Sequence, residues 1–530
     1  MSLKHIITSL FALTGNIVND VEKGLSKLGT VPTVPLPASL GDKGGSWSSI
    51  DPGSQTPPKT GNTVKYDWTI TRDHIAPDGY NRTAILINGQ FPGPLLEANW
   101  GDTVQVTVHN QIDTEGVTLH WHGLTQKETI WYDGVPGVSQ CPVAPGSSFT
   151  YTFIADQYGT SWYHSHYSAQ YTDGLFGPMV IYGPKTDEYD IDLGPIILED
   201  FFHTSYFEQN EEVFVKPPAG PIFATVDNNL INGKGLTLEC GSGSEYGGEC
   251  NTYGALAKFN FTTGKTHRLR LINAGSGGTQ YFRIDNHNIT VIANDFVPVK
   301  PYAVDYVTLA IGQRADILVT ATGKDGDAVW MRSDVDPTCS TYNTTNQAAL
   351  APIYYPKANR TSVPQTKDSG YAIGDCGNDA LAMTVPKYPQ PVLAPSTTSV
   401  LEITAGLNQT GNLVFMVNGS QFEVNYNTPI LNAESQGERT FPVTRNVFNF
   451  GSNDTVRLIV KNAFPQTHPM HMHGHNFQVL ATGTGDWDGT IVNPQNPQRR
   501  DTQALIPGSP EVPSFIVLQY AQDKDRKSVV

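Results

Sequence analysis

A chain of 530 residues is long enough for about three domains of ordinary size, each with its own core. Its 50 glycines and 37 prolines, with only 16% charged residues, favour many short strands and turns over long helices. The formal net charge of -16 at pH 7 argues against nucleic acid or an anionic membrane as a partner. These values are typical of an acidic, soluble, secreted protein.

The N-terminal region predicts export. Residues 1–20 begin with a charged stretch and continue into the apolar run Ile6 to Leu13, which is the order found in a signal peptide. Residues 21–62 are rich in Pro, Gly and Ser, and we expect a flexible lead-in without a core. No later stretch approaches the ~20 apolar residues that a membrane span needs. Acceptor sequences for N-glycosylation, which suit an extracellular glycoprotein, occur at Asn81, Asn260, Asn288, Asn343, Asn359, Asn408, Asn418 and Asn453.

Three segments share an eight-residue frame that runs from Thr through alternating apolar residues to Asn. They are Thr103–Asn110, Thr266–Asn273 and Thr455–Asn462. Such alternation predicts a half-buried strand, and the copies are spaced by whole domains and not by the short period of a solenoid. We therefore predict an all-β protein of three consecutive Greek-key β-sandwich domains. Their expected limits are 63–185, 186–385 and 386–530.

Histidines gather in three places, which together hold eight of the 14 in the chain. These are His120-Trp121-His122, His164-Ser165-His166 and His468-Pro469-Met470-His471-Met472-His473-Gly474-His475. A single His-x-His pair is more often an ordinary polar pair, but three clusters indicate metal binding, because imidazole is the commonest protein metal ligand. Residues two apart in an extended segment share a face, so His471 and His473 can bind one centre while His468 points elsewhere.

This number of imidazoles predicts several metal ions, since a closed zinc site takes only four ligands. A polynuclear copper site is the expected form. The second repeat is followed by no His-x-His pair, so the ligands should belong to the first and third domains, with the middle domain as a spacer. The lone histidines are expected to be ordinary surface or core residues, and they are His74, His203, His267 and His287.

The three motifs, with Asp133-Gly134-Val135-Pro136 and Ser139-Gln140-Cys141-Pro142, resemble the multicopper oxidases, and most closely the laccases of filamentous ascomycetes. The resemblance runs from about Val64 to about Asp523 and implies the cupredoxin fold for each domain. It also implies that His120 and His471 hold a type 2 copper and that His468 binds the type 1 copper. Four further histidines would supply part of the type 3 pair, namely His122, His164, His166 and His473. His475 is expected on the same face of the extended segment as His471 and His473, but it is not a ligand in the family.

The resemblance gives Asp133 a role in bringing protons to the oxygen site, which a carboxylate near bound water can physically play. An Asp-Gly turn residue without a catalytic role is an equal alternative. The family's fourth motif, His-Cys-His-x-x-x-His, supplies the type 1 thiolate, but no cysteine follows Cys376. We therefore expect an incomplete third domain, a truncated gene model or shifted splice junction, and a chain that as written is not a competent laccase.

The five cysteines contain two local pairs, Cys240 with Cys250 and Cys339 with Cys376, which we expect to form disulfides in an oxidising compartment. Cys141 would remain unpaired. In the family that the chain resembles, its counterpart pairs with a cysteine near the carboxy terminus.

The resemblance implies a secreted, monomeric laccase-type oxidase whose partners are a small phenolic donor and O2. The phenol would give up electrons one at a time, and four electrons would reduce one O2 to water. A non-catalytic copper-binding protein and a ferroxidase are the alternatives. The natural phenol stays open between a lignin fragment, a melanin precursor and a pigment intermediate.

Overall fold

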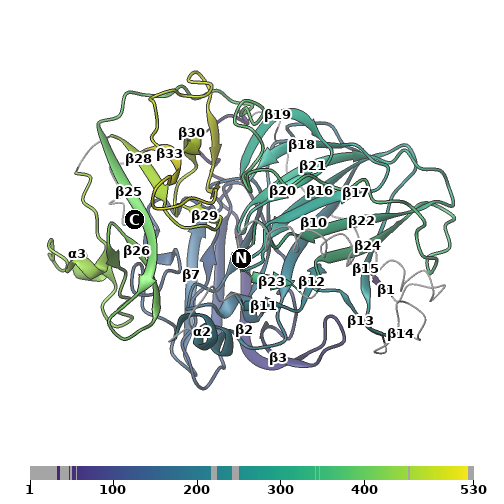
Figure 1. Ribbon diagram of the computed structural model, residues 1–530, viewed down its shortest axis with the longest axis horizontal. Coiled ribbons are helices and arrows are strands. Elements are labelled where there is room, and N and C mark those ends of the chain that lie inside the picture. The colour runs from purple at the N-terminus through teal and green to yellow at the C-terminus, as the bar shows by residue number, and fades with distance from the viewer. Residues whose placement is uncertain are drawn as a thin grey trace, which may run out of the picture.

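The computed structural model describes residues 33–35, 47, 50–54, 56–215, 224–240, 250–340, 342–344, 346–451 and 454–522. The signal peptide expected at residues 1–20 lies outside these residues. The regular structure of the described chain is almost entirely strand, and its α-helices are α2 (Tyr206–Phe214) and α3 (Ile430–Ser435) (Figure 1). No helix among the described residues is long and apolar enough to cross a membrane.

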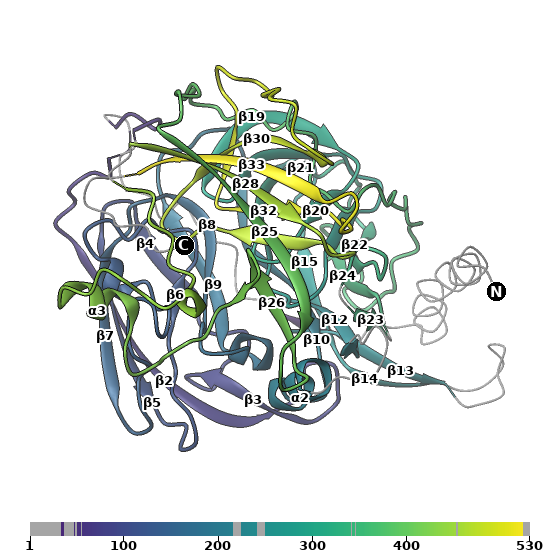
Figure 2. The same ribbon diagram turned by 60° about the vertical axis from the view of Figure 1, so that its left-hand side comes forward.

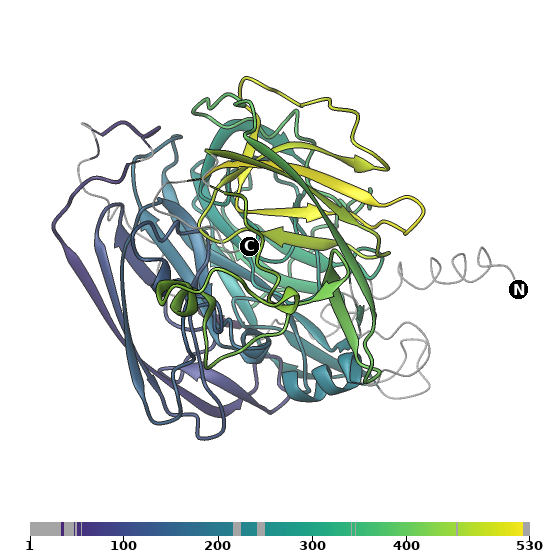
Figure 3. The same cartoon turned by 90° about the vertical axis from the view of Figure 1, so that its left-hand side faces the viewer.

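The N-terminal unit is a sandwich of two four-stranded sheets, drawn in purple and blue in Figure 3. One sheet has the order β3 (Arg82–Ile87), β2 (Thr63–Ile75), β5 (Thr103–Asn110), β7 (Ser148–Ile154). The other has the order β4 (Leu96–Asn99), β9 (Phe176–Tyr182), β8 (Gly159–His164), β6 (His120–Trp121). Aromatic rings of both sheets fill the core between them, including Trp68, Trp121, Tyr151 and Tyr163.

The middle unit packs two six-stranded sheets face to face, in teal and green in Figure 1. The first runs β1 (Thr33–Pro35), β15 (Leu256–Asn260), β24 (Ala348–Tyr354), β22 (Ala328–Val335), β17 (Gln280–Ile284), β20 (Val307–Leu309). The second runs β12 (Asn228–Ile231), β10 (Ile191–Phe201), β16 (Thr266–Asn273), β21 (Arg314–Thr320), β18 (Ile289–Asn294), β19 (Val297–Val304). Two short pairs lie outside these sheets, β11 (Ala224–Val226) with β23 (Tyr342–Thr344) and β13 (Leu236–Cys240) with β14 (Cys250–Gly254).

The C-terminal unit has one large sheet and one small one, in green and yellow in Figure 2. The large sheet runs β27 (Ser420–Gln421), β26 (Leu413–Val417), β25 (Thr397–Leu407), β28 (Thr455–Asn462), β33 (Ser514–Ala521), β30 (Phe477–Thr484), β31 (Gln498–Arg500). The small sheet pairs β29 (His468–His471) with β32 (Thr502–Leu505). The fold is therefore all-β, as the sequence predicts.

The three repeat segments become equivalent strands, β5, β16 and β28, and each ends in a fully buried asparagine. The Asn110 side chain donates to the carbonyls of Glu115 and Val143 and accepts from the backbone N–H two residues ahead. Asn273 and Asn462 repeat this pattern of two donated bonds and one accepted bond. The asparagine fixes the turn that leaves the strand by satisfying backbone groups that would otherwise be buried without partners.

Within residues 21–62, the expectation of a lead-in without a core does not hold for the described part, which contacts two units. Residues Thr33–Pro35 form β1, which pairs in parallel with β15 of the middle unit. Trp47 and Ile50 pack against the core of the N-terminal unit. Burial of these side chains and the added strand ladder anchor the segment, which composition alone does not reveal.

The cysteines follow the sequence prediction where their side chains are described. Cys339 and Cys376 form a disulfide, and Cys141 is free and exposed. Cys240 lies directly opposite Cys250 in the β13–β14 register, but the two side chains fall outside the described residues, so that disulfide stays a prediction.

Candidate metal centre

Strand alternation places the first group of histidines on one face of the N-terminal unit. In β6, Trp121 packs into the core, where its ring centroid lies 4.8 Å from that of Phe153. The flanking side chains, His120 and His122, therefore point away from the core. Strand β6 pairs with β8 so that His120 lies directly opposite His164, and their ring centroids are 5.3 Å apart.

The C-terminal unit brings its histidines to the same place. Strand β29 pairs with β32 with His471 opposite Thr502, and the chain continues to His473. The ring of His473 lies 4.0 Å from that of His120 and 5.2 Å from that of His166. Six of the seven predicted ligands thus lie together at the border of two units, although the chain between them is more than 300 residues long. The His120 and His471 rings are 5.7 Å apart.

Four of these rings are fixed through Nδ1. His120 Nδ1 is 2.8 Å from the backbone oxygen of Asp133, and His473 Nδ1 is 2.9 Å from an Asp133 carboxylate oxygen. His471 Nδ1 is 2.8 Å from the backbone oxygen of Asp501, and His164 Nδ1 is 3.0 Å from that of Ser165. An acceptor at Nδ1 fixes the tautomer and leaves Nε2 as a lone-pair donor, which is the usual arrangement around a metal-binding imidazole.

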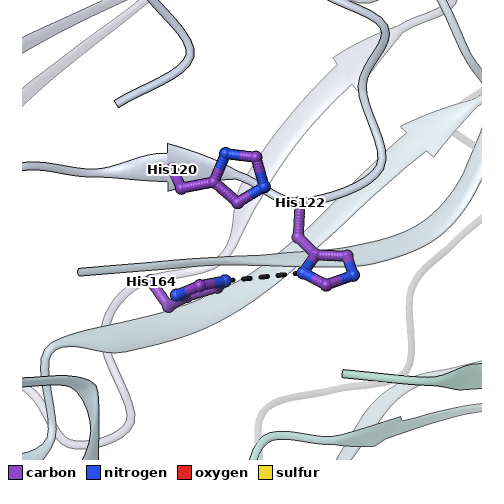
Figure 4. Close-up of side chains that lie close together, drawn as sticks. All are labelled: His120, His122 and His164. Carbon is purple, nitrogen blue, oxygen red and sulfur yellow. Dashed lines mark hydrogen bonds between the residues drawn. The ribbon is translucent and has the colours of Figure 1, made fainter. Parts of the chain in front are cut away.

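The free ring nitrogens meet inside the cluster. The Nε2 atoms of His120 and His471 are buried and have no hydrogen-bond partner among the described residues. Ring nitrogens of His120, His122 and His164 lie within 4.8 Å of one another, and so do those of His120, His471 and His473. Figure 4 shows the first of these groups, with His122 Nδ1 3.4 Å from His164 Nε2. Buried unpaired nitrogens converging at this range are the donor set that a metal ion would satisfy.

Burial keeps the imidazoles in the form that binds metal. It lowers the pKa of His122, His164 and His471 well below 6.5, and neighbouring rings lower these pKa values further. Burial also lowers the pKa of His166 to about 3. These four rings are therefore neutral at physiological pH, as ligation requires. Burial raises the pKa of Asp133, but His120 and His473 outweigh it and hold that pKa well below its usual value.

Comparison with known proteins decides the family. Three models described as multicopper oxidase match residues 69–186, 192–353 and 403–516. The chain belongs to the multicopper oxidases. It is 37% identical over 463 residues to Laccase-2 of Botryotinia fuckeliana, covering 85% of this chain and 77% of that protein. It is 36% identical over 501 residues to dihydrogeodin oxidase of Aspergillus terreus, covering 86% of this chain and 78% of the relative.

The solved structures agree with this family. The laccase from Botrytis aclada superposes with a TM-score of 0.77 at 33% identity, covering 91% of this chain and 86% of the other. A multicopper oxidase is an oxidoreductase that uses copper, and the imidazole cluster fits that metal, because neutral imidazole nitrogens suit copper well. This chain is therefore similar to laccases in sequence and in fold.

His468, the seventh predicted ligand of this multicopper oxidase, lies apart from the other six. Its ring is 5.4 Å from that of Phe415 and 5.6 Å from that of Phe464, and its Nε2 is buried with no hydrogen-bond partner among the described residues. Burial lowers the pKa of His468 to about 4. Among the described residues, no group of three metal-ligating side chains includes His468 or a cysteine.

The middle unit supplies no residue to the metal-ligating groups among the described residues, but it does contact the site. Arg314, the first residue of β21, contacts Asp501, and Asp501 Oδ1 lies 3.2 Å from His122 Nε2. Thr502 Oγ1 lies 3.1 Å from the same nitrogen. The sequence Arg500-Asp501-Thr502 gives no periodic or spacing signal for a metal site. Its contacts with the histidines and with Arg314 arise only from the packing of the three units.

Proposed function

We propose that this multicopper oxidase is of the laccase type. It takes electrons one at a time from a phenolic donor and delivers four to O2, which is reduced to water. The observation that carries this proposal is the cluster of six imidazoles between the N-terminal and C-terminal units, with buried ring nitrogens left free for metal. Bound copper would store the electrons and bind O2, which a protein without a redox group cannot do.

The histidines divide among three kinds of copper in this proposal. His120 and His471 would hold the type 2 ion, and His468 would ligate the type 1 ion on the donor side. The remaining four would bind the type 3 pair, and they are His122, His164, His166 and His473. The division is supported by the separation between His468 and the cluster and by its aromatic neighbours.

Asp133 has a double role in the proposed reaction. Its carboxylate accepts from His473 and lies 3.2 Å from His120 Nδ1, so it orients a ring from each unit. It is also buried, and it faces the region where O2 would be reduced. A carboxylate oxygen so placed can pass protons towards the oxygen atoms by hydrogen bonding, because each electron delivered to O2 calls for a proton.

The donor side fits an aromatic substrate. Phe415, whose ring lies beside His468, is 42% exposed. A phenol that stacks on such a ring would come within a short distance of the His468 imidazole. We further propose that the protein is secreted, glycosylated and monomeric, in agreement with its acidic charge and the Cys339–Cys376 disulfide.

A copper-binding protein without oxidase activity is the second candidate. It is favoured by one observation, the lack of a described cysteine or second histidine grouped with His468. A ferroxidase differs from a laccase only in its donor. The same assay distinguishes all three functions.

The test measures copper per chain by mass spectrometry, and then oxygen uptake with a methoxyphenol or with Fe(II). We expect copper binding that His120→Ala removes. Oxygen uptake with the phenol is expected from a chain extended with the family's fourth motif, His-Cys-His-x-x-x-His, and not from the 530-residue chain alone. Copper binding without uptake from either donor in the extended chain as well would establish the second candidate. Uptake with Fe(II) alone would establish the ferroxidase, and failure to bind copper would refute the proposal.

A further inference from the structure

We propose that Arg314 and Asp501 form a positioning pair that holds His122 and His471 in place for copper. The middle unit would then take part in the metal centre although it supplies no ligand. This inference rests on the proposed function, because it assigns a role to residues that border the same histidines. Both side chains of the pair are completely buried.

Asp501 contacts one histidine from each of the two ligand-bearing units. Its Oδ1 lies 3.2 Å from His122 Nε2, and its backbone oxygen accepts from His471 Nδ1 at 2.8 Å. Thr502 Oγ1 is 3.1 Å from the first ring and 3.2 Å from the second. The two rings stack with centroids 3.8 Å apart. A displacement of Asp501 would therefore move both rings at once.

The carboxylate of Asp501 is committed to Arg314 and so is not itself a ligand. Arg314 Nη1 donates to Oδ1 at 2.7 Å, and Nη2 donates to Oδ2 at 2.6 Å. Thr502 Oγ1 also donates to Oδ1, at 2.9 Å. Asp501 does lie within metal-binding range of His122 and His471. However, a bidentate charge-assisted pair is the strong kind of hydrogen-bonded contact, and ligation would have to break it.

The pair is anchored to all three units. Arg314 Nε donates to the backbone oxygen of Thr160 in the N-terminal unit. Asp295, in the middle unit, accepts from the backbone N–H of Arg314 at 3.0 Å. It also accepts from the backbone N–H groups of Asp501 and Thr502 in the C-terminal unit, at 3.1 and 3.3 Å. The geometry around His122 and His471 is thus set by how the middle unit docks.

A glycine in the first histidine motif gives independent support. Gly123 directly follows His122 and has a φ of +81°. A Cβ on this residue would lie 2.5 Å from Asp501 Oδ2 and 2.7 Å from Arg314 Nη2. The chain therefore needs glycine here for the pair to approach the ring of His122.

The experiment compares Arg314→Lys, Arg314→Met and Asp501→Asn with Arg332→Met. Arg332 forms an equally buried pair with Asp285, with both nitrogens at 2.7 Å, in the other sheet of the middle unit. Each full-length chain is titrated with Cu(II) against a chelator of known affinity. Thermal unfolding of the copper-free protein is measured in parallel, and the Cu(II) electron paramagnetic resonance spectrum is recorded after loading.

We expect Arg314→Met and Asp501→Asn to weaken Cu(II) binding roughly 10- to 100-fold, as loss of a partner behind a ligand does. Arg332→Met should lower thermal stability without changing copper affinity. Arg314→Lys keeps the charge but loses the paired bonds, so a smaller loss and an altered spectrum are expected. If Arg314→Met does not fold, the copper affinities of Arg314→Lys and Asp501→Asn test the proposal.

Wild-type Cu(II) affinity with an unchanged spectrum in both Arg314→Lys and Asp501→Asn would overturn the positioning pair. So would an equal loss of affinity in Arg332→Met, because that would show general destabilisation. Absence of Cu(II) binding by the wild-type chain would instead refute the proposed function, so the two failures are distinguishable.

Discussion

Asp133→Asn tests how much of the proposed copper affinity depends on one carboxylate. In the wild type, one carboxylate oxygen lies 2.9 Å from His473 Nδ1, and the other lies 3.2 Å from His120 Nδ1. An amide can keep its oxygen towards His473, because the His120 N–H already donates to the backbone oxygen of Asp133 at 2.8 Å, but this oxygen carries no net charge. The variant therefore exchanges a hydrogen bond to a charged acceptor, which contributes about 1.5–3 kcal/mol, for a neutral one of about 0.5–1.5 kcal/mol, a difference of about 1–1.5 kcal/mol.

A loss of this size corresponds to roughly a 5- to 10-fold weaker affinity for copper. Asp78→Asn is the matched control, because Asp78 is buried like Asp133 and lies 2.8 Å from a ring nitrogen of His203, outside the cluster. We expect both variants to unfold at lower temperature and only Asp133→Asn to bind Cu(II) more weakly in a chelator competition. Equal copper affinities for the two variants and the wild type would show that Asp133 does not orient the ligands.

Three further changes have expected outcomes. Gly123→Ala forces a side chain at positive φ against Asp501, so we expect thermal denaturation to show a loss of about 1–3 kcal/mol. Replacing Cys339 and Cys376 by Ser should lower the free energy of unfolding by about 2–4 kcal/mol in urea, because their disulfide closes a loop with a sequence separation of 37. Burial lowers the pKa of His267 to about 4. As pH falls, the unfolded chain therefore takes up a proton at this imidazole before the folded chain does, and stability falls as pH drops from about 6.5 towards 4. His267→Gln should lose less stability over that window, and an identical pH profile would contradict this reasoning.

Much of the fold could be predicted because its signals are local. The alternation in Thr103–Asn110 and its two copies corresponds to β5, β16 and β28. The spacing of His120 and His122 depends only on the period of a strand, so their shared face is also readable from sequence. Convergence with His471 follows once the ligand count is compared with what one unit offers.

The rest depended on contacts between distant segments. Arg314 and Asp501 are 187 residues apart, and neither lies in a spacing pattern that marks a metal site. The anchoring of Trp47 was missed because a Pro/Gly/Ser-rich composition describes the backbone and not what one aromatic side chain can reach. Such contacts form only when the units pack against one another, and a local sequence pattern does not encode that packing.

The division of the histidine cluster between two units has a consequence for maturation. Asp133 and His473 are in contact although 340 residues separate them in the chain. A ribosome therefore completes the N-terminal unit long before the second half of the cluster exists. Copper cannot be captured by the six imidazoles while synthesis is at that stage. The complete set of six imidazoles therefore exists only once the C-terminal unit has docked against the N-terminal unit, so assembly of the full metal centre is coupled to docking of the last-made unit.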